Sequence, residues 1–258
     1  MKKLIFMMTI ASSVASAAII SKPISYEMGK TKFEGVLIYD DAVKTPRPGL
    51  VVVPNWLGVT EANVKQAQNL AGSKYVFFVA DMYGTQNRPK NMDEAAKASG
   101  AVKGDRKLMR ARVNKALEVL KAQGKSAPID LSKLGALGFC FGGTTALELA
   151  RSGAAIGGVV SFHGGLDTPN IEDAKKITAH VLALHGADDP YVPKKDVDAF
   201  VEEMRAAKVD WQLVSYGNSV HSFTDVDANM PGQAQYNEKT AKRAYAEMDR
   251  FWAEVFGG

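Results

Sequence analysis

Apolar residues along the chain follow two different patterns. Short, unbroken apolar runs, typical of strands buried on both faces of a parallel sheet, occupy residues 50–53 and 76–80. Similar, mostly apolar runs recur at residues 134–137, 156–162, 181–184 and 211–214. Between these runs, apolar residues recur with helical spacing at residues 64–71, 108–120, 200–204 and 241–255. This alternation predicts an α/β protein in which crossover helices cover both faces of a mostly parallel, doubly wound sheet.

Two segments depart from this alternation. Residues 24–28 and 33–38 predict short strands joined by a turn at residues 29–31, and therefore an N-terminal antiparallel hairpin. Residues 83–103 begin with Gly, Pro, Asn and Lys, and predict a long excursion over the carboxyl ends of the strands, where such sheets bind ligands. No internal repeat or change in composition divides the chain, so we expect a single domain over residues 18–258.

The first 17 residues have the pattern of a secretory signal peptide. Lys2 and Lys3 precede an apolar run at residues 4–10, and the small residues Ala15-Ser16-Ala17 follow it. A membrane anchor is the alternative, but the run is shorter than the roughly 20 residues that span a bilayer. We therefore expect cleavage after Ala17 and a secreted, periplasmic protein.

The composition is that of an ordinary globular protein. Of the 258 residues, 46% are hydrophobic and 23% are charged, which excludes disordered, collagen-like and disulfide-scaffold classes. Without Lys2 and Lys3 of the leader, the basic residues fall from 32 to 30, against 28 acidic residues. The basic residues are dispersed among acids, so we expect no nucleic-acid partner, no membrane association after cleavage, and a monomer or weak homodimer.

The strand predicted at residues 134–137 leads directly into the sequence GFCFGG and then into a helical segment. This is the G-x-nucleophile-x-G pattern of a strand-turn-helix elbow, with Cys140 in the nucleophile position. At a helix N-terminus, the dipole and the free N–H groups favour a thiolate. A glycine-rich nucleotide-binding turn is the alternative, but neither G-x-G-x-x-G nor G-K-[ST] is present. Cys140 is the only cysteine, so in an oxidising compartment it is buried and inert, reactive, or paired between chains.

An acid and a histidine follow Cys140 in the order that α/β-hydrolases use. Asp188 and Asp189 lie in a loop after the strand at residues 181–184, and His221 lies in a loop after the next strand. Asp189 is preferred over Asp188 because it directly precedes the sequence PYVP. Its expected role is to accept a hydrogen bond from His221 and fix the tautomer that faces the sulfur.

The other histidines have simpler interpretations. His180 lies at the polar start of a strand and is expected at the surface. His163 and His185 end buried strands and are interpreted as hydrogen-bonded core histidines, with a pocket wall as the alternative. No metal-ligand spacing such as H-E-x-x-H occurs, so we expect neither a metal nor another cofactor.

Five short sequences make the chain similar to the dienelactone hydrolase family, a branch of the α/β-hydrolases with a cysteine nucleophile. They are VPNWLG at residues 53–58, ADMYG at 80–84, GFCFGG at 138–143, DPYVP at 189–193 and HSF at 221–223. The resemblance implies an α/β-hydrolase fold and a triad of Cys140, Asp189 and His221. It also implies an oxyanion hole formed by the backbone N–H groups of Trp56 and Phe141.

Two positions differ from the dienelactone-cleaving members of that family. Where those members have a glutamate that interacts with the resting thiol, this chain has Asn55. Where they have an arginine that holds the substrate carboxylate, it has Asp225. Together with Tyr83 and Ser222, these two residues are the candidates for the substrate pocket, and the change of charge favours a neutral or cationic ester or lactone.

The leading hypothesis is therefore a hydrolase of small carboxylic esters or lactones that works through an acyl-thioester on Cys140. Two alternatives remain open. A catalytically weak binding protein with the same fold would also carry Asn55 and Asp225. A thiol-redox role for Cys140 is less favoured, because the chain has no resolving cysteine.

Overall fold

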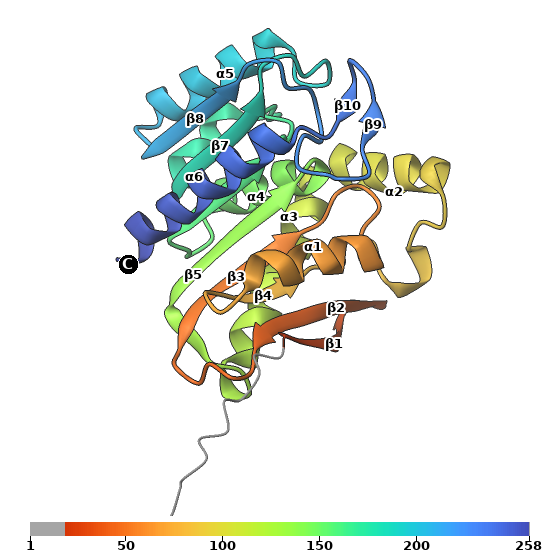
Figure 1. Ribbon diagram of the computed structural model, residues 1–258, viewed down its shortest axis with the longest axis vertical. Coiled ribbons are helices and arrows are strands. Elements are labelled where there is room, and N and C mark those ends of the chain that lie inside the picture. Colours follow the sequence, from red (N-terminus) through yellow and green to blue (C-terminus); the bar gives the residue numbers. More distant parts are fainter. Residues whose placement is uncertain (1–18, 258) are drawn as a thin grey trace, which may run out of the picture.

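The computed structural model describes residues 19–257, and the leader predicted for residues 1–17 lies outside them. Eight strands form one mixed sheet in the order β1-β2-β4-β3-β5-β6-β7-β8, with helices on both faces (Figure 1). The strands are β1 (Ile19–Met28), β2 (Thr31–Asp40), β3 (Arg47–Val53), β4 (Val76–Val79), β5 (Ile129–Phe139), β6 (Gly158–Phe162), β7 (His180–Gly186) and β8 (Trp211–Tyr216).

The direction of the strands matches the predicted α/β-hydrolase arrangement. Strands β1 and β2 form the antiparallel hairpin, and β2 also pairs antiparallel with β4. From β4 through β3 and β5 to β8, all neighbours are parallel. The predicted doubly wound, mostly parallel sheet with an N-terminal hairpin is thus confirmed, and the carboxyl ends of β5, β6, β7 and β8 meet at one edge.

The helices divide between the two faces of the sheet because successive side chains of a strand point to opposite faces. Val51 and Val53 pack into a core with α3 (Arg106–Ala122), α4 (Phe141–Arg151) and α5 (Lys194–Ala206). Leu50 and Val52 pack into a second core with α1 (Glu61–Ala71) and α6 (Glu238–Phe256). Residues 49–53 of β3 and all of β4 are therefore buried on one side or the other, which explains the unbroken apolar runs there.

The excursion predicted at residues 83–103 contains the short 3-10 helix η1 (Thr85–Asn87) and the helix α2 (Met92–Gly104). The side chain of Asn91 caps α2 by accepting a hydrogen bond from the N–H of Glu94. Only Ala95 and Val102 of α2 are buried, so the helix carries almost no apolar periodicity. This weak pattern is the reason that the sequence predicted a long excursion there without a helix.

The remaining elements are the 3-10 helices η2 (Gln123–Lys125) and η3 (Ile171–Lys176) and the short strands β9 (Asn229–Met230) and β10 (Ala234–Gln235). The two short strands pair with each other beyond the end of the main sheet. Across residues 19–257, no helix is both long enough and apolar enough to cross a membrane.

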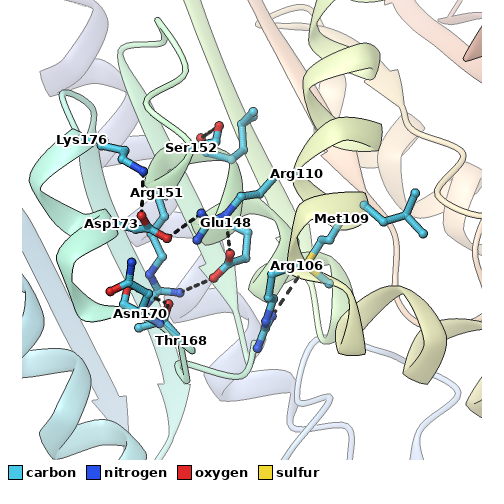
Figure 2. Close-up of polar contacts among 12 residues, drawn as sticks. Arg106, Met109, Arg110, Glu148, Arg151, Ser152, Thr168, Asn170, Asp173 and Lys176 are labelled. Carbon is cyan, nitrogen blue, oxygen red and sulfur yellow. Dashed lines mark hydrogen bonds and ion pairs between the residues drawn. The ribbon is translucent and has the colours of Figure 1, made fainter.

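A buried group of charged side chains anchors the end of α4 that lies away from Cys140 (Figure 2). Arg151 is fully buried and bonds Glu203 of α5 at 2.6 Å and Glu148 at 3.0 Å. Glu148 also accepts a 2.8 Å hydrogen bond from Arg110 of α3, which in turn bonds Asp173 of η3 at 2.6 Å. The helix that begins at Cys140 is thereby fixed to three neighbouring elements.

We predict that Arg151→Met lowers the free energy of unfolding by about 3–5 kcal/mol, because it leaves two buried carboxylates with less compensation. The matched control is Arg205→Met, which breaks an ion pair with Glu202 whose side chains are both largely exposed. The control is expected to cost no more than about 1 kcal/mol. Urea unfolding of both variants is the measurement, and equal losses would contradict the assigned role of Arg151.

Candidate active site

Cys140 lies in a tight turn between β5 and α4, and its backbone has an unusual conformation. Its φ of 54° is positive, a region that residues other than glycine rarely adopt. A Cβ atom at Gly138 would lie 2.0 Å from the carbonyl oxygen of Gly142, so the strand and the helix approach too closely for any side chain there. Such strain typically occurs at functional sites, where the surrounding structure holds it in place.

The first turn of α4 packs against the loop that follows β3. A Cβ atom at Gly142 would lie 2.0 Å from the carbonyl oxygen of Val53, which shows how close the two segments are. The hydroxyl of Tyr83 donates a 2.8 Å hydrogen bond to the carbonyl oxygen of Trp56 and so fixes the loop. Within residues 19–257, the backbone N–H groups of Trp56 and Phe141 donate to no acceptor. Both groups therefore remain available for a ligand oxygen.

His221 and Asp189 lie on two separate loops and bond directly to each other. The Nδ1 atom of His221 lies 2.7 Å from Oδ2 of Asp189, and both residues are buried. The other carboxylate oxygen of Asp189 accepts the N–H of Tyr191 at 2.8 Å, which fixes its orientation. Asp188 is exposed. The structure thus pairs His221 with Asp189, the acid that the sequence favoured.

The backbone of His221 is held by the segment that carries β9 and β10. Its N–H donates to the carbonyl oxygen of Gln233 at 3.2 Å, and its carbonyl oxygen accepts the N–H of Gln235 at 3.0 Å. The ring of Tyr191 packs edge-on against the imidazole, with centroids 5.2 Å apart. These contacts leave the imidazole little freedom to rotate.

The environment of His221 favours its protonated form. Burial acts to lower its pKa, but hydrogen bonds to Asp189 and to the Cys140 side chain, with the charges of both partners, raise the pKa to about 10. Since Nδ1 bonds Asp189, the nitrogen that faces Cys140 is Nε2. The raised pKa of His221 therefore favours an imidazolium beside the Cys140 side chain at neutral pH.

The structure brings the candidate pocket residues Asn55 and Asp225 together. Nδ2 of Asn55 lies 3.5 Å from Oδ2 of Asp225, while Oδ1 of Asn55 accepts hydrogen bonds from the Leu57 N–H and from Nδ2 of Asn63. Asn55 therefore orders the loop around Trp56 and contacts Asp225. The sequence did not reveal the part of Asn63, which directly precedes the helical spacing at residues 64–71 and lies in the first turn of α1.

The other two pocket candidates have different surroundings. Tyr83 is almost completely buried and packs against the Phe141 ring, with centroids 5.8 Å apart, so it supports the site from beneath. Ser222 follows His221 with a positive φ of 55°, and its carbonyl oxygen accepts the N–H of Asp225. This local turn directs the chain from His221 to Asp225.

The remaining histidines differ in their distance from the site. His180 pairs with Asp210 at 2.9 Å and is well exposed. His185 is buried, and burial lowers its pKa. His163, interpreted from sequence as a core residue, lies against both Cys140 and His221. In the part of the chain that the structure describes, no three His, Cys, Asp or Glu side chains are grouped as metal ligands.

Comparisons with known proteins agree with this architecture. The family model described as "Dienelactone hydrolase family" matches residues 33–256. A solved structure named m3DLH is 40% identical, covers 92% of this chain and 99% of its own, and has a TM-score of 0.85. A dienelactone hydrolase-like promiscuous phosphotriesterase from metagenomic libraries is 37% identical, with coverages of 93% and 99% and a TM-score of 0.86.

A curated relative supports the same grouping. The probable 2-oxo-3-(5-oxofuran-2-ylidene)propanoate lactonase of Bradyrhizobium sp is 30% identical over 201 residues, which cover 73% of this chain and 79% of that protein. The match to the family model extends over almost all of the described residues and includes Cys140, Asp189 and His221. The chain therefore belongs to the dienelactone hydrolase family.

Proposed function

We propose that the protein hydrolyses small carboxylic esters or lactones, with Cys140 as the nucleophile and His221 and Asp189 as its partners. The observation that carries this proposal is the position of the His221 imidazole, whose Nδ1 atom lies 2.7 Å from the Asp189 carboxylate and whose pKa is raised both by that carboxylate and by the neighbouring Cys140 side chain. Membership of the dienelactone hydrolase family and similarity to a probable lactonase support the substrate class.

The first half of the reaction forms an acyl-thioester. The sulfur of Cys140 attacks the carbonyl carbon, a C–S bond forms, and the π electrons move to the oxygen. The N–H groups of Trp56 and Phe141 stabilise this oxyanion, and such donors each contribute about 3 kcal/mol. As the tetrahedral intermediate collapses, the C–O bond breaks and the imidazolium of His221 donates its proton to the leaving alkoxide.

The second half consumes water. Acylation removes the negative charge from the sulfur, and with it one of the contributions that raise the pKa of His221. The neutral imidazole then accepts a proton from water, whose oxygen attacks the thioester carbonyl. The C–S bond breaks, the carboxylic acid leaves, and the thiolate-imidazolium pair returns. Asp189 keeps Nδ1 protonated throughout, so that Nε2 always faces the reacting atoms.

The negative charge of Asp225 near the proposed site supports a neutral or cationic substrate. The Asp225 residue is only partly buried, and its carboxylate lies beside Asn55. Asn55 belongs to the loop that contains Trp56. A carboxylate on the substrate would be repelled there. We propose that Asp225 disfavours anionic esters and lactones, which separates this chain from the dienelactone-cleaving members that it resembles.

The predicted leader extends the proposal to location. We propose that residues 1–17 direct the protein to the periplasm and are removed there, and that residues 18–258 act as one domain, as a monomer or weak homodimer. Under this proposal the substrate is a small molecule outside the cytoplasm. Size-exclusion chromatography and N-terminal sequencing of the secreted protein test both points.

We predict that Cys140→Ala lowers kcat/KM for p-nitrophenyl acetate and for small lactones by at least about 10³-fold, because no other group can form the thioester. Cys140→Ser is expected to retain only a small fraction of the activity, since a hydroxyl ionises far less readily than a thiol. Initial rates across a panel of esters and lactones are the measurement. Wild-type rates in Cys140→Ala would refute the proposal, and stoichiometric ligand capture without turnover would favour a binding protein.

Asp189→Asn is expected to lower kcat by about 10³–10⁴-fold, because the amide no longer selects the productive tautomer of His221. The matched control is Asp188→Asn, which removes the neighbouring exposed carboxylate and is expected to keep the wild-type kcat. Steady-state kinetics on one activated ester compares the two. The assignment fails if the two substitutions have the same effect.

Asp225→Asn is expected to raise kcat/KM for p-nitrophenyl succinate relative to p-nitrophenyl acetate by about three- to tenfold, because it removes a like charge worth about 1 kcal/mol. Asp227→Asn, which neutralises an exposed carboxylate two residues away, is the control. The gain is expected to shrink at high salt. If the ratio of the two substrates stays constant, Asp225 does not select against anions.

A further inference from the structure

His163 connects the two halves of the proposed site through its two ring nitrogens. It directly follows β6, is almost completely buried and has a positive φ of 39°. Its Nδ1 atom lies 3.1 Å from the backbone nitrogen of Cys140, and its Nε2 atom lies 2.7 Å from the hydroxyl oxygen of Thr224. Thr224 is itself buried and lies three residues after His221.

These bonds define the protonation of the ring. The Cys140 N–H donates to the carbonyl oxygen of Phe162 at 3.0 Å and shares this hydrogen with Nδ1 of His163. A backbone N–H can only donate, so Nδ1 of His163 is an acceptor and carries no proton. The single proton of the neutral ring is then on Nε2 and is donated to Thr224. Burial, and secondly the nearby charge of His221, hold the pKa of His163 well below its ordinary range, so the ring stays neutral beside the imidazolium.

The ring also packs against the His221 loop at two further points. The His221 ring lies edge-on at a centroid distance of 5.3 Å, and the Phe223 ring lies edge-on at 5.0 Å. His163 therefore contacts the His221 loop by one hydrogen bond and two ring contacts. Its Nδ1 atom is bonded by the backbone N–H of Cys140 in the elbow. An apolar side chain of similar size fills the same space but makes neither polar bond.

We propose that His163 is a positioning residue that sets the distance between the Cys140 sulfur and the His221 imidazole. The inference rests on the proposed function, in which the two groups exchange a proton. Without His163, the elbow and the His221 loop keep their own backbone contacts but lose the hydrogen bonds and ring contacts that His163 makes with both. A misplacement of about 1 Å between reacting groups is enough to slow an enzyme about 100-fold.

Other ionisable groups near His221 do not supply this connection. His185 approaches from the end of β7, and Asp189 and Tyr191 approach from the loop that follows it. Neither Asp189 nor Tyr191 forms a hydrogen bond to the Cys140 backbone among residues 19–257, whereas His163 does. Asp189 orients the imidazole, and His163 holds the segment that carries it.

Four substitutions separate the two bonds. His163→Leu removes both. His163→Asn keeps an acceptor near the Nδ1 position, and asparagine tolerates the positive φ. Thr224→Val removes only the acceptor of the Nε2 proton. The control is Thr240→Val, which removes a buried hydroxyl that bonds Ser219 in the segment leading to His221 but leaves His163 untouched.

We expect His163→Leu to lower kcat for p-nitrophenyl acetate about 10- to 100-fold with KM nearly unchanged. His163→Asn is expected to recover part of this loss. Thr224→Val is expected to lower kcat by a smaller factor. In the double variant with His163→Leu, the loss from Thr224→Val is not expected to add to the loss from His163→Leu. Thr240→Val is expected to behave as wild type. A loss of kcat below threefold in His163→Leu would overturn the inference. Fully additive losses of kcat from His163→Leu and Thr224→Val would also overturn it.

A second readout does not depend on the substrate. Cys140 is the only cysteine, so iodoacetamide reports on this thiol alone, and its rate is measured between pH 5 and pH 9. Slower alkylation of His163→Leu near neutral pH supports the inference even if no ester is turned over, while a wild-type pH profile contradicts it. Thermal unfolding checks the fold, and if His163→Leu does not fold, the Thr224→Val profile decides.

Discussion

The close approach of β5 and α4 is the constraint on which the site depends. Glycine at positions 138 and 142 brings backbone atoms to distances that no Cβ atom permits, and Cys140 is left in a positive-φ turn. This turn directs the Cys140 N–H toward Phe162 and His163 and leaves the Phe141 N–H free. The position of the proposed nucleophile Cys140, the free N–H of Phe141 and the contact to His163 all follow from one backbone geometry.

The rest of the fold keeps that geometry in place. Every residue of α4 is buried, and its last turn is fixed by the ion pairs of Arg151, far from the sulfur. At the other end, the Trp56 loop is held by Tyr83 and by the Asn55 and Asn63 amides. The His221 loop is held by the β9 and β10 segment and by His163. The Trp56 and His221 loops of the proposed site are thus held in place by contacts with the rest of the fold.

The sequence predicts the sheet because apolar runs are a local signal of buried strands. It predicts Cys140, Asp189 and His221 as site residues because each lies in a turn or loop that follows a predicted strand. It does not predict α2, which is mostly exposed and has little apolar periodicity. It also misses the contacts of His163 with Cys140 and Thr224, and those of Asn55 with Asn63 and Asp225. These join residues distant in sequence or in different loops, and only the folded chain brings them together.

The account's central claim is that the Cys140 sulfur forms a covalent acyl intermediate. Its most direct test is rapid acid quenching of the enzyme during hydrolysis of a slowly deacylated ester, followed by mass spectrometry of the intact chain and its peptides. The account predicts an added acyl group on the peptide that contains Cys140, labile to hydroxylamine. Continued turnover with an unmodified Cys140 peptide, or an acyl group on another residue, would contradict it.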